Sequence, residues 1–114
     1  MSLKTSMYEA TFILRQDIPS TEVSKMVDVL TSLIKENDGE VLKHEYWGLR
    51  TLAYPVKKNK KGHYVMLVLK ASHRAFLELQ RRVKLSEDII RNLIIKIEAF
   101  DSNDSIMMSA DNEK

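Results

Sequence analysis

The sequence predicts an α+β fold in which two helices cover one face of a four-stranded antiparallel sheet. Two stretches carry apolar residues three and four positions apart, as amphipathic helices do, and four carry the alternation or the β-branched residues of strands. Their order is strand, helix, strand, strand, helix, strand, which is the split βαβ or ferredoxin-like arrangement, βαββαβ. With 114 residues, 44% of them hydrophobic, the chain has material for one core and therefore one domain.

The first two elements are a strand and a helix. In residues 7–14, MYEATFIL, apolar side chains at every second position give one face that can enter a core. A helix is expected from Pro19, as a first-turn residue, because apolar residues then recur at helical spacing until Asn37-Asp38-Gly39 supplies a stop. The apolar stripe of this helix is Val23, Met26, Val27, Leu30, Leu33 and Ile34.

Strands two and three are expected to form a hairpin. Residues 40–56 and 63–70 are rich in β-branched, aromatic and aliphatic side chains, and the lysine-rich segment 57–62 between them is predicted to be a loop. Strands one and three are central in a split βαβ sheet, so strand two is expected at an edge. Gly48 permits a bulge or a close approach there, or is simply tolerated. Trp47 and Tyr54 are expected to pack in the core or on a sheet face rather than to stack on bases.

The second half of the fold closes with a helix and a strand. Ser72 can cap the helix, and after a turn at residues 85–88 the run IIRNLIIKI forms a strand over residues 89–97. The domain is therefore assigned to residues 7–100, preceded by an N-terminal extension, residues 1–6. Residues 101–114 are polar, acidic and aperiodic, and are expected to form a flexible tail. The apolar side of the second helix is Ala75, Phe76, Leu79 and Val83.

Several classes of function find no support in the residues. The chain has no cysteine, which excludes disulfides, cysteine-ligated zinc and thiol catalysis and agrees with a reducing compartment, so the cytoplasm is expected. The histidines at positions 44, 63 and 73 are isolated, and the three glycines form no phosphate-binding loop. No segment is apolar over the length of a bilayer span. We therefore expect no enzyme activity, no metal or other cofactor, no small-molecule substrate and no membrane partner.

Basic residues are concentrated in one segment. Residues 46–100 contain twelve Lys and Arg against four Asp and Glu, whereas residues 1–45 contain five against eight. A concentrated positive field attracts polyanions, because each neutralised phosphate releases condensed counterions. Lysines that only promote solubility are the alternative. The candidate RNA-contacting residues are four lysines of the expected loop and three further arginines: Lys57, Lys58, Lys60, Lys61, Arg81, Arg82 and Arg91.

One RNA-binding domain of this architecture has a different third strand. An RNA-recognition module carries K/R-G-F/Y-G/A-F-V-x-F/Y there, with aromatic rings that stack on bases. Lys61-Gly62 begins this pattern, but the places that should follow are occupied by His63, Tyr64, Val65 and Val68. Stacking of bases by that motif is therefore not expected.

The hairpin segment resembles a known family. WGLRTLAYPVKK, followed by GHY, is similar to the hairpin of the bacterial-type small-subunit ribosomal protein S6 family, in which Gly-x-Arg-x-Leu-Ala-Tyr-x-Ile-Lys precedes a short basic loop and Gly-x-Tyr. Val56 stands in place of the isoleucine, and Thr51 in a place more often charged or amide-bearing. YEATFIL, NDGEV and the region 79–95 extend the resemblance over about residues 7–97. The matching hairpin residues are Gly48, Arg50, Leu52, Ala53, Tyr54 and Lys57.

The resemblance implies a non-enzymatic structural constituent of the small ribosomal subunit that binds 16S ribosomal RNA cooperatively with ribosomal protein S18. Glu45 and Arg50, expected to be exposed charges of the edge strand, would then mark the surface that accepts S18; otherwise they only discourage unwanted strand addition. Judged on the residues alone, a ferredoxin-like regulatory or ligand-binding module that does not bind nucleic acid stays open as the alternative function.

Overall fold

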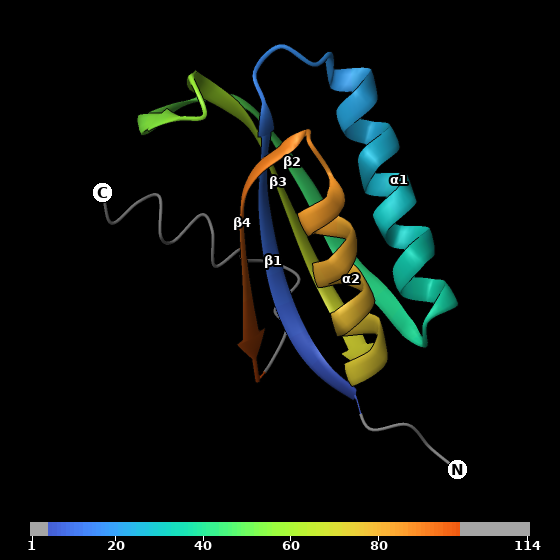
Figure 1. Ribbon diagram of the computed structural model, residues 1–114. Coiled ribbons are helices and arrows are strands. Elements are labelled where there is room, and N and C mark those ends of the chain that lie inside the picture. The colour runs from blue at the N-terminus through green and yellow to red at the C-terminus, as the bar shows by residue number, and fades with distance from the viewer. Residues whose placement is uncertain (1–4, 99–114) are drawn as a thin grey trace.

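The computed structural model describes residues 5–98 (Figure 1). Its elements are β1 (Thr5–Arg15), α1 (Ser20–Glu36), β2 (Gly39–Val56), β3 (Asn59–Ser72), α2 (His73–Leu85) and β4 (Ile89–Ile97). The strands form one sheet in the order β2-β3-β1-β4, and all neighbouring pairs are antiparallel. The predicted fold class is confirmed, although β1 begins at Thr5 rather than at Met7. The expected acidic tail, residues 101–114, lies outside the described residues.

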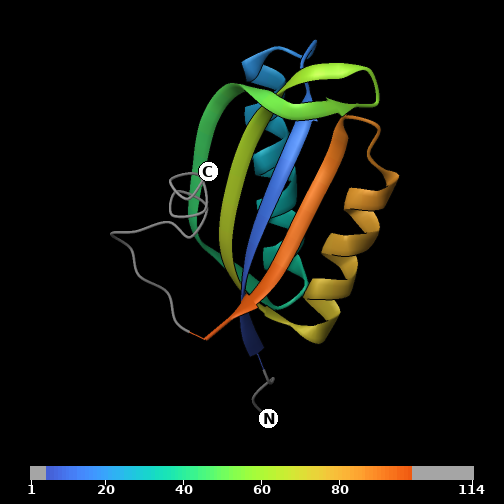
Figure 2. The ribbon, with the colours of Figure 1, turned by 90° about the vertical axis from the view of Figure 1, so that its left-hand side faces the viewer.

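The two helices lie on one face of the sheet (Figures 1 and 2). β1 and β3 occupy the centre and β2 and β4 the edges, as the split βαβ arrangement predicts. Because side chains alternate along a strand, every second residue of β1 and β3 enters the layer between sheet and helices. The largest side chains of this core are Phe12, Leu14, Leu67 and Leu69 from the sheet and Leu30, Ile34 and Leu79 from the helices.

The opposite face of the sheet, here called the open face, has a smaller apolar cluster. Within residues 5–98 no helix covers this face (Figure 2). Met66 and Val68 of β3 are nevertheless buried, because partly buried side chains of neighbouring strands pack against them. Those side chains are Met7, Leu42, Trp47, Tyr64 and Ile97.

The helix ends follow from the local sequence, with one correction. Pro19 precedes α1 as its N-cap, with an extended backbone, and is not a first-turn residue. Asp38, with a φ of 66°, lies in the predicted stop between α1 and β2. Ser72 caps α2 as predicted: its Oγ accepts a hydrogen bond from the backbone nitrogen of Ala75 at 3.1 Å. The fully buried part of the predicted α1 stripe is Val23, Leu30 and Ile34.

The predicted loop at residues 57–62 is wrong. The connection between the strands is a two-residue turn at Lys57 and Lys58, and β3 begins at Asn59, so Lys60 and Lys61 belong to a strand. Lys57 and Lys58 have φ angles of 48° and 67°, the left-handed conformation that both central residues of a type I′ hairpin turn adopt. Lysine rarely occupies such positions, which glycine, asparagine and aspartate usually fill. The sequence therefore pointed to a longer connection.

Candidate nucleic-acid and partner interface

The outer part of the β2–β3 hairpin bends across the sheet toward the start of β4 (Figure 2). Its pairing becomes irregular between Thr51 and Val56, and extra residues in one strand of a pair bend that strand. A separate buried cluster, here called the hairpin cluster, holds the bent segment in place. It consists of Ile13 of β1, Leu52 of β2 and Ile90 of β4. The hairpin tip is therefore anchored to the body of the protein by packing.

Asn59 stabilises the lysine turn at this tip. Its Nδ2 donates hydrogen bonds to the carbonyl oxygens of Val56, at 3.3 Å, and Lys57, at 3.0 Å. Its Oδ1 accepts a hydrogen bond from the backbone nitrogen of Gln16 at 3.0 Å, and Gln16 Oε1 accepts one from the backbone nitrogen of Lys61 at 3.1 Å. These reciprocal bonds tie the hairpin to the segment between β1 and α1, so the tip has a fixed position.

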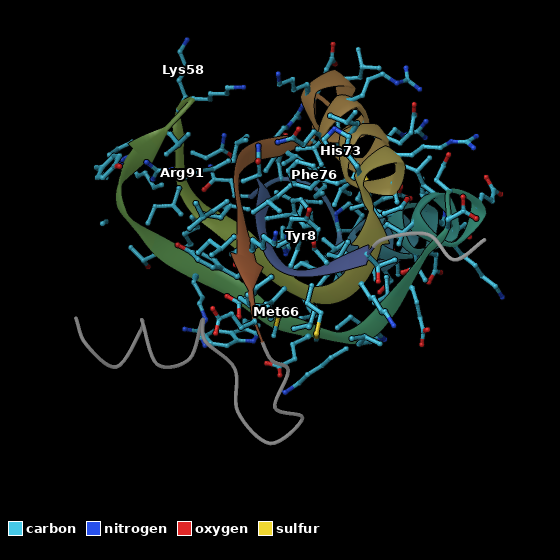
Figure 3. The ribbon with its side chains drawn as sticks, turned by 90° about the horizontal axis from the view of Figure 1, so that it is seen from below. Tyr8, Lys58, Met66, His73, Phe76 and Arg91 are labelled. Atoms are coloured by element: carbon cyan, nitrogen blue, oxygen red, sulfur yellow. The ribbon has the colours of Figure 1, made fainter. Side chains whose placement is uncertain are left out.

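The four predicted phosphate-binding lysines lie in and directly after this turn, and all four side chains are exposed. Figure 3 shows Lys58 pointing away from the sheet and Arg91 between β4 and the hairpin. Arg91 Nη2 donates a hydrogen bond to the hydroxyl of Tyr54, and its Cζ lies 5.0 Å from the centre of the Tyr54 ring. The fold thus brings Arg91 to the same hairpin as Lys57, Lys58, Lys60 and Lys61.

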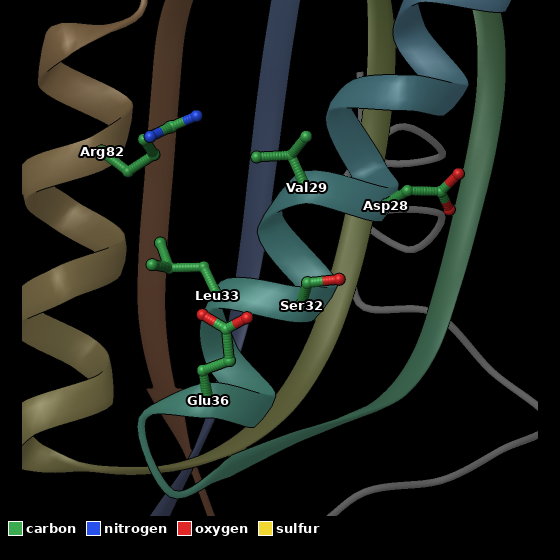
Figure 4. Close-up of a pocket in the computed structure, with 6 residues that line it drawn as sticks. All are labelled: Asp28, Val29, Ser32, Leu33, Glu36 and Arg82. Atoms are coloured by element: carbon green, nitrogen blue, oxygen red, sulfur yellow. The ribbon is translucent and has the colours of Figure 1, made fainter.

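Arg81 and Arg82 lie elsewhere, on α2 in the helical layer. Arg81 forms an ion pair with Glu78 at 3.1 Å. Arg82 reaches toward α1, where it lines an open groove with Asp28 and Glu36 among other residues (Figure 4). An acidic neighbour therefore offsets the charge of Arg81, and the structure does not bring either arginine together with the lysine turn.

Edge strand β2 contains a bulge at Gly48, which is one of the roles that the sequence left open for this glycine. The register with β3 shifts between Tyr46 and Gly48, which leaves Trp47 as the extra residue. Gly48 has a φ of 85°, which residues with a side chain rarely adopt. A Cβ at this position would meet no atom within 4 Å, so the backbone conformation and not a lack of space selects glycine.

Trp47 organises the charged residues of this strand. Its indole Nε1 donates a hydrogen bond to Glu45 Oε1 at 2.6 Å, and the guanidinium carbon of Arg50 lies 4.7 Å from the indole ring centre. Lys43 forms an ion pair with Glu45 Oε2 at 2.9 Å. The expectation that both edge charges are exposed holds for Arg50 but is wrong for Glu45, whose side chain is 26% exposed. Glu45 is partly covered because it faces the apolar cluster around Met66, its partner in β3.

The carboxylate of Glu45 makes stability depend on pH. Its pKa is lowered from the ordinary value of 4.5, chiefly by the hydrogen bond from Lys43 and also by the one from Trp47, with burial opposing. A lowered pKa means that the charged form stabilises the fold above about pH 4.5, and that this contribution is lost as the pH falls through the folded-state pKa.

We therefore expect Glu45→Gln to be less stable than the wild type at neutral pH, by an amount that shrinks as the pH falls below 4.5. Urea unfolding of both proteins across this pH range measures the difference. A Glu22→Gln variant serves as control because Glu22, in an exposed ion pair with Lys25, should give a smaller difference at neutral pH. A difference for Glu45→Gln that stays constant with pH would contradict this assignment.

His63 has a structural role. Its Nε2 lies 2.8 Å from the carbonyl oxygen of Ile18, and its Nδ1 lies 2.7 Å from the hydroxyl of Tyr46. Because a carbonyl only accepts, Nε2 donates, and in the neutral ring Nδ1 accepts from the hydroxyl.

Across residues 5–98 no group of three or more histidine, aspartate or glutamate side chains could hold a metal ion. In the same part of the chain, no helix is long and apolar enough to cross a membrane.

Sequence reasoning missed three residues that shape this interface: Gln16, Asn59 and Tyr54. No local pattern marks Gln16 or Asn59, because their hydrogen bond joins residues 43 positions apart. Tyr54 was expected to pack but is 55% exposed, whereas Trp47 packs on the open face as expected. The one local signal for Tyr54 is its place in LAYPV, directly before the lysines.

Comparisons with known proteins agree on one family. The family model described as ribosomal protein S6 matches residues 7–96. Proteins named small ribosomal subunit protein bS6 from Rickettsia canadensis and Rickettsia prowazekii are both 48% identical to the chain. These matches cover 90% and 88% of this chain and 85% and 83% of the relatives. The crystal structure of 30S ribosomal protein S6 from Thermotoga maritima is similar with a TM-score of 0.77 and 25% identity, covering 97% of this chain and 100% of the other. The chain belongs to the ribosomal protein S6 family.

Proposed function

We propose that the protein is a structural constituent of the small ribosomal subunit in the cytoplasm. In this proposal it catalyses no reaction, and it binds 16S ribosomal RNA cooperatively with ribosomal protein S18. Family membership supports the proposal, since the relatives are named as proteins of the small ribosomal subunit. The fold supports it through two features of the β2–β3 hairpin, the lysine turn and the free edge of β2.

The fixed lysine turn is the observation that carries the RNA part of the proposal. Its backbone is held by the hydrogen bonds of Asn59 and Gln16, while its lysine side chains extend into solvent. Phosphate contacts of this kind position a protein on RNA without reading its sequence. Arg91 belongs to the same surface, and Arg81 and Arg82 would contact RNA from the helical layer.

The outer edge of β2 supports the protein-partner part of the proposal. Within residues 5–98, β2 has a neighbour in the sheet on one side only, and an edge strand can accept a partner there. Arg50 is exposed on this strand and stacks on Trp47, so its guanidinium is held in a defined place. Arg50 would contact S18, while Glu45 would act indirectly by holding Trp47 and Lys43.

The cooperative part of the proposal is tested by titrating 16S ribosomal RNA with this protein alone, with S18 alone and with both. If the two proteins bind as a unit, each binds the RNA more tightly when the other is present, because the coupling free energy is reciprocal. Equal affinities in all three titrations would contradict cooperative binding.

We expect Arg50→Ala to weaken the binding of S18 while changing the free energy of unfolding by no more than about 0.5 kcal/mol, as is usual for exposed sites. Isothermal titration of the variant with S18 gives the affinity, and urea unfolding gives the stability. Arg74→Ala, which removes an exposed arginine from α2, is the matched control and should bind S18 as the wild type does. An unchanged affinity of Arg50→Ala would remove Arg50 from the interface.

A further inference from the structure

We propose that Tyr54 and Arg91 together form a stacking site for one unpaired nucleobase of the bound RNA. This inference rests on the proposed function, because it assumes that the lysine turn lies against RNA. The lysines of the turn bind phosphates and therefore do not distinguish paired from unpaired nucleotides. Tyr54 and Arg91, which lie outside the turn, would make that distinction.

The position of Tyr54 is unusual for a large aromatic side chain. Leu52 and Val56, two positions before and after it on β2, pack into the hairpin cluster with Ile13 and Ile90. Tyr54 stays 55% exposed, which makes it the most exposed aromatic residue of the described part of the chain. Its ring therefore presents surface to solvent from a segment that packing holds in place.

Arg91 fixes the orientation of this ring. Its guanidinium lies over the ring, with Cζ 5.0 Å from the ring centre, and Nη2 donates a hydrogen bond to the hydroxyl. The two contacts restrain both the plane and the outer end of the side chain. A ring that is held in this way loses little rotational freedom when a flat ligand stacks on it.

The other aromatic side chains near this strand are engaged differently. The hydroxyl of Tyr46 is bonded to His63, and its ring stacks on the imidazole with ring centres 5.9 Å apart. Trp47 packs against Met66 and Val68 on the open face and is only partly exposed. Tyr54 is thus the aromatic residue of the described chain that combines a mostly exposed ring with the basic hairpin tip.

The chemistry of the site selects an unpaired base. RNA-binding proteins stack exposed bases on aromatic rings and on guanidinium planes, and both groups are present here. Lys57 and Lys58 follow Tyr54 closely along the same hairpin and can hold the phosphates on either side of a base. A base inside a duplex has both of its faces covered by neighbouring pairs, so the site favours a bulge, a loop or a single strand.

The test compares two short RNA hairpins that differ only in one 2-aminopurine, which is bulged in one and paired with uridine in the other. The wild-type chain should bind the bulged RNA more tightly and change its 2-aminopurine fluorescence. Tyr54→Leu should bind the bulged RNA about tenfold more weakly and leave this fluorescence unchanged on binding, because a stacked base is lost. Its affinity for the paired RNA and the salt dependence of both affinities should stay as in the wild type.

Three further variants complete the test. Tyr54→Phe keeps the ring and should keep most of the fluorescence change, whereas Arg91→Ala should lose much of it. Leu93→Ala, which truncates a side chain of β4 that is 58% exposed, is the control and should behave as the wild type does. If Tyr54→Leu fails to fold, the fluorescence changes of Arg91→Ala and Tyr54→Phe still test the stacking site.

The outcomes separate this inference from the proposed function. If the wild-type chain binds both RNAs with equal affinity and Tyr54→Leu changes neither, the stacking site is overturned while RNA binding stands. If the wild-type chain binds neither RNA at low salt, nor 16S ribosomal RNA when S18 is present, the RNA-binding function itself is overturned.

Discussion

Replacing Lys57, Lys58, Lys60 and Lys61 together with alanine should weaken the binding of 16S ribosomal RNA by about 100-fold or more at low salt. Each phosphate contact contributes roughly 0.9 to the slope of log K against log salt concentration for a duplex, so loss of all four should flatten that slope by about 3.6. Filter binding at several salt concentrations measures both quantities. The fold should persist, because all four side chains are exposed.

A matched control separates this effect from a change of net charge. Lys25 and Lys35 of α1 and Arg74 and Lys84 of α2 are exposed basic residues of the helical layer, and replacing these four with alanine removes the same charge but should leave the salt slope nearly unchanged. If the four-lysine variant keeps the wild-type slope, the lysines of the hairpin serve solubility and do not contact phosphates.

Asn59→Ala should have the largest effect of a single exchange at the hairpin. Asn59 is 9% exposed and makes three hydrogen bonds, so its loss leaves a backbone N–H and two carbonyl groups without these partners. Unsatisfied groups of this kind typically cost about 1–3 kcal/mol, and we expect a loss of about 2 kcal/mol in the free energy of unfolding. RNA affinity should also fall although every lysine remains, because the turn is no longer held in place.

Urea unfolding and RNA titration of the same variant measure the two effects of Asn59→Ala. Asn59→Asp keeps an acceptor for the backbone nitrogen of Gln16 but loses both donated bonds, so its stability should lie between those of the wild type and Asn59→Ala. A loss below about 0.5 kcal/mol, typical of an ordinary surface exchange, would show that the backbone alone forms the turn.

The fold could be predicted because its signals are local. The alternation of MYEATFIL and the spacing of Val23, Leu30 and Ile34 each report one buried face, and both faces enter the same core. Ser72 could be identified as a cap because a helix start needs an oxygen acceptor there. Gly48 could be linked to a bulge because an isolated glycine in a strand often marks one.

The structure of the hairpin tip could not be predicted, because contacts between residues far apart in the sequence determine which residues form the turn. Asn59 and Gly62 are turn-forming types and suggested a loop, yet both are buried strand residues. A Cβ on Gly62 would lie 2.3 Å from Ile13 Cγ2 of β1, so close packing between strands requires glycine at this position. The turn falls instead on Lys57 and Lys58, where the bonds of Asn59 offset the cost of a left-handed lysine.

The candidate interface was likewise only partly predictable. The cluster of lysines is visible in the sequence, but whether Arg81, Arg82 or Arg91 lies beside it depends on which layer each arginine occupies. Glu45 could be placed on an edge strand, with Lys43 and Trp47 two positions away on the same strand, but the spacing did not reveal that its carboxylate bonds to both. Side-chain partners across strands are tertiary information that periodicity does not contain.

Sedimentation of the native protein from a cell lysate through a sucrose gradient tests the central claim most directly. Fractions that contain small ribosomal subunits are identified by their 16S ribosomal RNA, and the protein is detected with an antibody. A constituent of the small subunit should be found in those fractions with little left at the top of the gradient. If the protein stays at the top while 16S ribosomal RNA sediments normally, it is not a subunit constituent, and a soluble regulatory or ligand-binding module becomes the better account.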